Sequence, residues 1–166
     1  MGRRLRRATT VSGAVALLIA ISPALADSDK PDSRDTAVIQ KCIDAKTGSN
    51  WAWESCIGVV SEACVKDEGS MLSSEVIACY DRERFVWDNI LNDSFRRLRE
   101  ALDDQQQQKL REMQRAWIAS RDKTCHFIYD YFEGTMANPM IAACRSRETG
   151  RRALFLLGFA NDTRGK

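Results

Sequence analysis

Charged side chains within otherwise apolar helical stripes are the residues of this sequence that could do chemistry. Arg121 lies on a stripe that steps by three and four residues from Leu110 through Trp117 to Cys125, the period of an amphipathic helix. Glu83 interrupts a similar apolar stripe earlier in the chain. A buried charge is costly unless it is paired. We therefore expect Glu83 and Arg121 to meet as a hydrogen-bonded ion pair.

Two further polar residues, Gln114 and Arg152, fall on the inward stripes of their own helices. Gln114 could satisfy the hydrogen-bonding groups that the charged pair leaves over. The set of Glu83, Gln114, Arg121 and Arg152 could form the floor of a binding cleft, or it could fix the register of the packed helices. We favour the structural interpretation.

Motifs for catalysis are largely missing from the sequence. There is no G-x-S-x-G, glycine-rich phosphate loop or H-E-x-x-H, and His126 is the only histidine. Asp103 and Asp104 could act as an acid and base, but adjacent acids at a helix start are more typical of caps. A zinc site is disfavoured because no C-x-x-C pair is present. We expect a protein that is not an enzyme and has no cofactor or metal, with His126 at the surface.

Residues 1–26 have the pattern of a cleaved secretory signal peptide. Four arginines precede a short apolar run, and Ala24-Leu25-Ala26 resembles a signal-peptidase site. The apolar run is shorter than the roughly 20 residues that a permanent membrane span needs. No cysteine stands at the cleavage point to carry a lipid anchor. These features predict a periplasmic or secreted protein without stable membrane insertion.

Removal of the signal changes the charge balance, because it holds four of the 25 basic residues and none of the 23 acidic ones. The remaining 21 basic and 23 acidic side chains give a net charge of −2, which leaves nucleic-acid binding without support. The remaining length suits one domain with one core. We expect a flexible tail at 27–35, a single helical domain at 36–158 and a polar tail at 159–166.

All six cysteines follow the signal, and an even number in an exported chain indicates disulfides. The spacing around the intervening turns favours three pairs: Cys42–Cys56, Cys64–Cys79 and Cys125–Cys144. The main competing arrangement joins Cys42 to Cys79 and Cys56 to Cys64. Connectivity is not fixed by sequence alone.

Helical periodicity extends through the chain, and no alternating strand pattern interrupts it. We expect an all-α bundle of about five helices, at 36–46, 51–63, 73–102, 104–132 and 139–157. Several aromatic residues are expected mostly in the core, with one or two at a partner surface: Trp51, Trp53, Tyr129, Tyr131 and Phe132.

Three motifs together resemble a known family. They are E-x-x-x-W-D-x-x-L-N at 83–92, Q-R-A-W-I-x-x-R-D-x-x-C at 114–125 and C-x-x-x-x-T-x-x-R-x-x-x-L at 144–156. Over residues 64–156 the chain resembles the LprI-type lysozyme inhibitor domain of bacterial envelope proteins. The motif residues are Glu83, Trp87, Asn92, Gln114, Trp117, Arg121, Asp122, Thr149 and Arg152. Because they fall on the stripes expected to be buried, we interpret them as scaffold.

The resemblance implies a small, exported, disulfide-bonded helical protein that binds a protein partner, for which a lysozyme is the candidate. Such a protein would act by steric occlusion, which requires no chemistry of its own. The contacts would then come from two irregular segments, represented by Glu133 and Gly134 in one and by Asp67 and Glu68 in the other. The alternative is an envelope structural or interaction protein with a different partner and no lysozyme inhibition.

Overall fold

A computed structural model describes residues 32–46, 50–67 and 73–163. The described chain is all-α, as expected, and contains six α-helices and one short 3-10 helix. In chain order these are α1 (Ser33–Asp44), α2 (Asn50–Trp53), η1 (Glu54–Cys56), α3 (Ser61–Asp67), α4 (Ser73–Ala101), α5 (Asp104–Phe132) and α6 (Ala137–Asp162). The expected signal at 1–26 lies outside the described residues.

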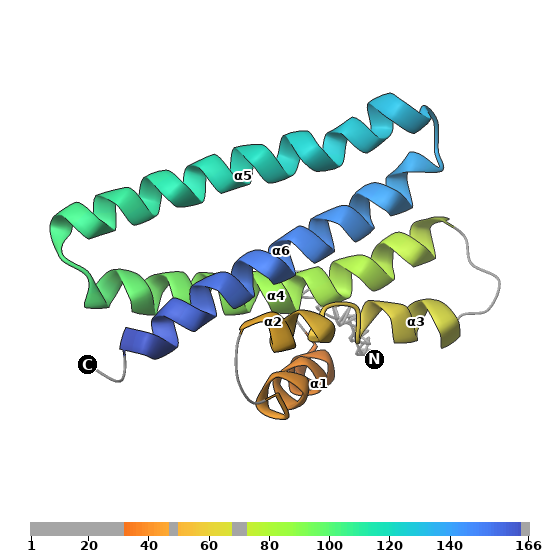
Figure 1. Ribbon diagram of the computed structural model, residues 1–166. Coiled ribbons are helices and arrows are strands. Elements are labelled where there is room, and N and C mark those ends of the chain that lie inside the picture. Colours follow the sequence, from red (N-terminus) through yellow and green to blue (C-terminus); the bar gives the residue numbers. More distant parts are fainter. Residues whose placement is uncertain (1–31, 47–49, 68–72, 164–166) are drawn as a thin grey trace, which may run out of the picture.

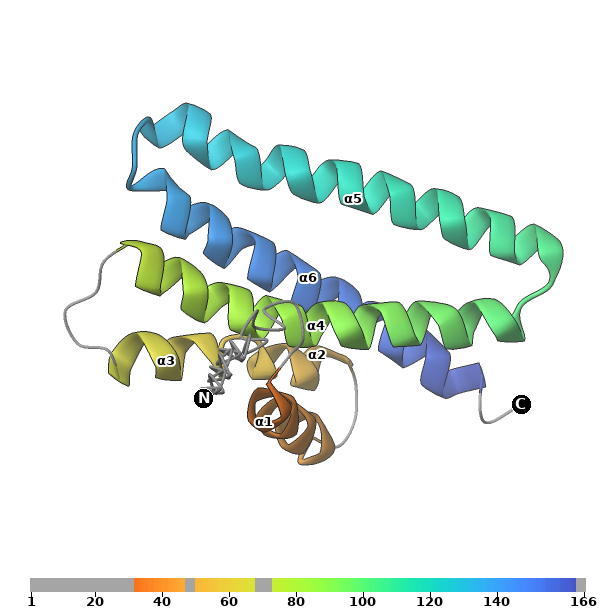
Figure 2. The same ribbon diagram turned by 180° about the vertical axis from the view of Figure 1, so that it is seen from behind.

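The three long helices determine the shape of the molecule. Helix α6 packs against both α4 and α5, and the short helices α1 and α3 pack on α4 (Figure 1). Seen from behind, α5 again runs along the outer edge, on the far side of α6 from the short helices (Figure 2). The fold therefore has α4 and α6 at its centre and α5 as an outer arm.

The core forms where α4 and α6 meet. Trp87 and Leu91 of α4 and Leu154 and Leu156 of α6 are buried. Helix α6 buries mainly small residues besides its leucines, which lets its backbone come close to its neighbours. At Gly150 a Cβ atom would lie 3.0 Å from Ile57 Cγ1, a tight contact that the absence of a side chain avoids.

The N-terminal helix α1 is held on α4 by a charge pair as well as by apolar packing. Asp35, only 6% exposed, accepts hydrogen bonds from Arg82 Nε at 3.0 Å and Nη2 at 2.8 Å. The same interaction raises the pKa of the Arg82 guanidinium. Asp32 caps the start of α1 by accepting from the backbone N–H of Arg34 at 2.8 Å. Because of this cap, α1 begins at Ser33, within the segment expected as a tail.

All three expected disulfides are confirmed. Cys42–Cys56 joins α1 to η1, Cys64–Cys79 joins α3 to α4, and Cys125–Cys144 joins α5 to α6, with Cα–Cα distances of 5.8, 5.6 and 5.6 Å. These distances lie in the usual range for disulfides. Each bridge fastens a peripheral helix to a neighbouring element.

The second expected helix, 51–63, is not continuous. Helix α2 is followed directly by η1, which ends at Cys56, and α3 begins only at Ser61. Gly58 adopts a φ of +103°, a conformation that ends helical geometry. The apolar spacing continues across the break, so helical periodicity alone does not reveal it.

Helix α5 has the expected bounds, whereas α6 begins earlier and ends later than expected. Helix α5 begins with Asp103 as N-cap, in a capping box with Gln106. Helix α6 spans Ala137–Asp162 instead of the expected 139–157, so residues 159–162 of the expected tail are helical.

Candidate functional site

Glu83 lies at the centre of a buried hydrogen-bonding network, but its partners are not those expected. Its carboxylate accepts from the backbone N–H groups of Gly58 (2.6 Å), Val60 (3.1 Å) and Ser61 (2.7 Å), and from Ser61 Oγ (2.8 Å). Trp87 Nε1 donates to it at 2.8 Å. Glu83 has no exposed surface. It therefore fastens the break between η1 and α3 onto α4.

The expected ion pair between Glu83 and Arg121 is wrong. Arg121 lies on α5, which packs on α6, whereas Glu83 faces the segment between η1 and α3. The Arg121 guanidinium donates instead to the neighbouring Asp122, with Nη2 at 2.8 Å from Oδ1. Backbone N–H groups take the place of the expected arginine, since hydrogen bonds also stabilise a buried carboxylate.

Gln114, Trp117, Arg121 and Arg152 do come together, between α5 and α6. Arg152 Nε donates to Gln114 Oε1 at 2.8 Å. The guanidinium carbons of Arg121 and Arg152 lie 4.9 and 5.5 Å from the centre of the Trp117 ring, within cation–π distance. Burial lowers the pKa of the Arg152 guanidinium. The cluster joins the outer arm to the centre of the fold.

The remaining motif residues are distributed between core and surface. Trp87 and Thr149 have no exposed surface. Asn92 is exposed, and its Nδ2 donates to Asp88 Oδ2 at 3.1 Å on the same helix. Asp122 is also exposed. The motif thus marks helix contacts and surface pairs rather than one shared cleft.

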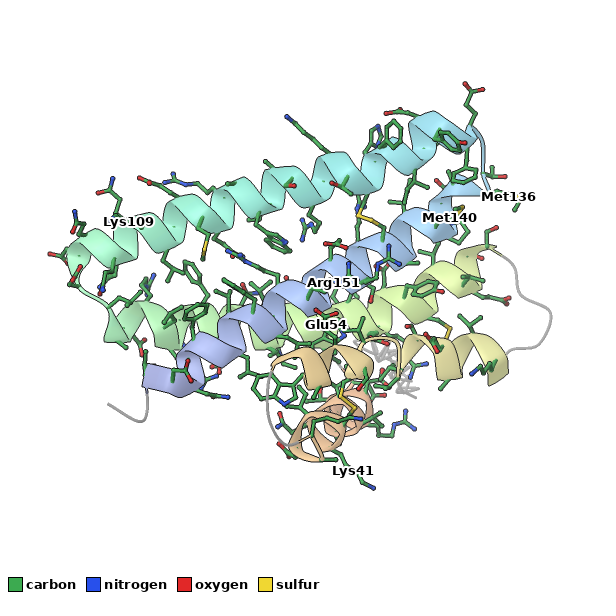
Figure 3. All side chains as sticks on the ribbon, viewed as in Figure 1. Lys41, Glu54, Lys109, Met136, Met140 and Arg151 are labelled. Atoms are coloured by element: carbon green, nitrogen blue, oxygen red, sulfur yellow. A yellow bond between two sulfur atoms is a disulfide. The ribbon has the colours of Figure 1, made fainter. Side chains whose placement is uncertain are left out.

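Large apolar side chains gather at the end of the α5–α6 hairpin. Phe127 is 63% exposed, Tyr131 70%, Phe132 51% and Met136 77%. Tyr129 and Met140 are exposed as well. Figure 3 labels Met136 and Met140 at this end of the molecule. We call Phe127, Tyr131, Phe132 and Met136 the hairpin tip.

The turn between α5 and α6 is sharply bent at the two residues expected to contact a partner. Glu133 has a φ of +46° and Gly134 a φ of +95°, both in the left-handed region. Both residues are exposed. The bend is costly for the glutamate, which lacks the freedom of glycine. It ends α5 abruptly next to the hairpin tip.

The hairpin tip as a whole is not among the surfaces expected from the sequence. Tyr131 and Phe132 belong to the aromatic set expected mostly in the core, but both are exposed. The spacing of two aromatic residues does point to this surface. Phe127 and Tyr131 stand four residues apart, so they share a helix face, and this face differs from the stripe that carries Trp117 and Cys125.

The second expected contact segment cannot be placed, because Glu68 and the side chain of Asp67 lie outside the described residues. Trp51 is described only as part of helix α2, whereas Trp53 is half-buried against the core. His126 is exposed, with Nε2 4.0 Å from Asp130 Oδ1.

Within the described ranges, no group of three or more His, Cys, Asp or Glu residues could hold a metal ion. None of the helices in these ranges is long and apolar enough to cross a membrane.

Comparison with known families identifies the family of the chain. The family described as Lysozyme inhibitor LprI matches residues 64–156, which is more than half of the chain. The chain belongs to this family. The matched region runs from the first cysteine of the Cys64–Cys79 bridge into α6 and includes the LprI motif residues and the hairpin tip. Searches of curated proteins and of solved structures gave no match.

Proposed function

We propose that this protein is an exported, non-enzymatic inhibitor that covers the active-site cleft of a lysozyme-type cell-wall hydrolase with its hairpin tip. Membership of the LprI family supports inhibition as the activity. Three disulfides support an oxidising compartment such as the periplasm or the extracellular space. The exposed hairpin tip is the observation that carries the choice of surface.

The hairpin tip has the composition of a protein-binding surface. Aromatic side chains and methionine are enriched in the central parts of protein interfaces, and an exposed apolar cluster often marks such a site. Tyr131 contacts Phe132 edge to face, with ring centres 4.9 Å apart, and lies 6.2 Å from Phe127. These contacts hold the rings before a partner arrives, which reduces the entropy lost on binding.

The rigidity of the hairpin suits steric occlusion. Cys125–Cys144 joins α5 to α6 directly behind the hairpin tip. Asp130 and Glu133 add two exposed carboxylates beside it. Such carboxylates would favour the approach of a basic enzyme, although the net charge of −2 expected for the mature chain makes this attraction modest.

A titration of lysozyme activity on a cell-wall suspension tests the proposal. Mature protein should abolish lysis near a stoichiometric ratio. The variant Tyr131→Ser/Met136→Ser should need at least tenfold more protein for the same inhibition, because central aromatic contacts dominate interface energy. The matched control Met113→Ser/Phe159→Ser removes one methionine and one aromatic ring that are 37% and 48% exposed elsewhere, and should inhibit normally.

Two results would count against the proposal. One is the absence of inhibition at a large excess of mature protein over several lysozymes. The other is equal inhibition by wild type and the hairpin-tip variant, which would move the contact surface elsewhere. Recovery of an endogenous partner from an envelope extract, without any effect on lysozyme, would favour the alternative of an interaction protein.

A further inference from the structure

A cleft of about 620 Å³ lies among α1, α2, α4 and α6, and none of its lining residues belongs to the hairpin tip. Its volume is within the range of about 300–1,000 Å³ that is usual for small-ligand sites. Side chains from four separate helices meet here. The cleft plays no part in the proposed inhibition, so its function is a separate question.

The charges that line the cleft balance each other. Asp44 and Asp93 supply two carboxylates, and Lys46 and Arg97 supply two cations. Arg97 Nε lies 3.0 Å from Asp93 Oδ2, and Asp44 Oδ1 accepts from Gln40 Nε2 at 2.7 Å. A ligand with a strong net charge of either sign therefore gains little here.

The neutral part of the lining combines a polar rim with an apolar floor. Asn89 and Asn161 are exposed and carry both donor and acceptor atoms, whereas Ile90 and Leu157 are half-buried. Trp53 adds a half-buried aromatic ring. A sugar ring matches this arrangement, because its hydroxyl groups lie around the edge and its C–H groups form the faces.

Two buried donors on the lining residues also favour a ligand that is rich in oxygen. Trp53 Nε1 and Arg97 Nη1 have no acceptor among the described residues. A buried donor without an acceptor is unfavourable, so these N–H groups would be stabilised by a ligand oxygen or by a bridging water. Both atoms have almost no exposed surface, so direct contact with a ligand oxygen requires a side-chain rotation.

We infer that this cleft binds a short neutral oligosaccharide. Asn89 and Asn161 bind its hydroxyl groups, and Trp53 with Leu157 contacts a ring face. The inference is independent of the proposed inhibitory function, because the two surfaces share no residue.

Titration of the isotope-labelled mature protein with cellobiose and N,N′-diacetylchitobiose, followed by NMR, tests the inference. The Trp53 indole N–H and the Asn89 side-chain amide should shift together and saturably with at least one of the two disaccharides. Asn89→Leu and Asn161→Leu should each weaken binding about two- to tenfold, the effect of one lost neutral hydrogen bond. Asn92→Leu, on the same helix but outside the cleft, should bind as the wild type does.

Three results would overturn the inference: no saturable shift with either disaccharide, shifts only with glucuronate or inorganic phosphate, or equal weakening by Asn92→Leu. Thermal melts of each variant establish that it is folded. Lysozyme inhibition measured on Asn89→Leu keeps the two proposals apart, because this variant should inhibit normally whether or not it binds sugar.

Discussion

Replacement of Glu83 by glutamine tests the buried network with little change in shape. The carboxylate accepts five hydrogen bonds, divided between its two oxygens. Oε1 accepts from the backbone N–H of Gly58 and from Trp87 Nε1, and Oε2 accepts from the backbone N–H groups of Val60 and Ser61 and from Ser61 Oγ. Glutamine supplies only one oxygen, so an NH2 group must face one of these two sets.

The expected loss of stability follows from this count. If the NH2 group replaces Oε1, the N–H groups of Gly58 and Trp87 lose their acceptor. If it replaces Oε2, the N–H groups of Val60 and Ser61 lose theirs, while the Ser61 hydroxyl can reverse and accept. Two buried donors are left unpaired in either case, at about 1–3 kcal/mol each. We expect Glu83→Gln to lower the free energy of unfolding by about 3 kcal/mol.

Urea and thermal unfolding of the disulfide-intact mature protein measure this change. For a domain of this size, a loss of about 3 kcal/mol corresponds to a decrease in Tm of about 10 °C. Glu100→Gln, an exposed site on the same helix, should change stability by less than about 0.5 kcal/mol. A Glu83→Gln protein within about 1 kcal/mol of wild type would refute the assignment of this carboxylate as the acceptor for the break.

Three further changes test other parts of the fold. Gly150→Ala places a Cβ 3.0 Å from Ile57. Urea unfolding should show a loss of about 1 kcal/mol, because the cost of overpacking exceeds the gain in helix propensity. If the stability changes of Gly150→Ala and Ile57→Ala were fully additive in the double variant, the contact between the two residues would be contradicted. Arg34 lowers the pKa of the Asp32 carboxyl, so this carboxylate stabilises the fold above its unfolded-state pKa and loses the effect as pH falls through the folded-state value. Asp32→Asn should therefore lower the Tm slightly near neutral pH and leave it unchanged in strong acid, and a pH-independent difference would be inconsistent with the pairing. Trp117→Ala should lower the free energy of unfolding by about 2 kcal/mol, less than the loss of about 3–5 kcal/mol for a fully buried ring, because this indole is half-buried. An unchanged urea midpoint would show that the ring does not join α5 to α6.

Helical content and disulfide pairing could be predicted because they depend on local spacing. The apolar period places α4 and α5 close to their observed bounds. Cys125 and Cys144 stand at similar distances from one turn, so antiparallel helices bring them together. The break at Gly58 was missed because its cause, the carboxylate of Glu83, lies 25 residues further along the chain.

Helical periodicity identifies which face of a helix is apolar but not which neighbour covers it. Glu83 and Arg121 each lie on such a face, yet the two faces meet different partners. Periodicity also overestimated the burial of α5, where Leu110 and Cys125 are the buried residues. The exposure of Tyr131 and Phe132 follows from the position of α5 at the edge of the fold, which sequence spacing does not specify.

Hydrogen exchange of the mature protein, alone and with lysozyme, tests most directly whether the hairpin tip is the inhibitory surface. Our account predicts slower exchange at 127–140 in the complex, with the helix α1 and the middle of α4 unchanged. Protection confined to α1 or α4, with 127–140 exchanging as in the free protein, would contradict it.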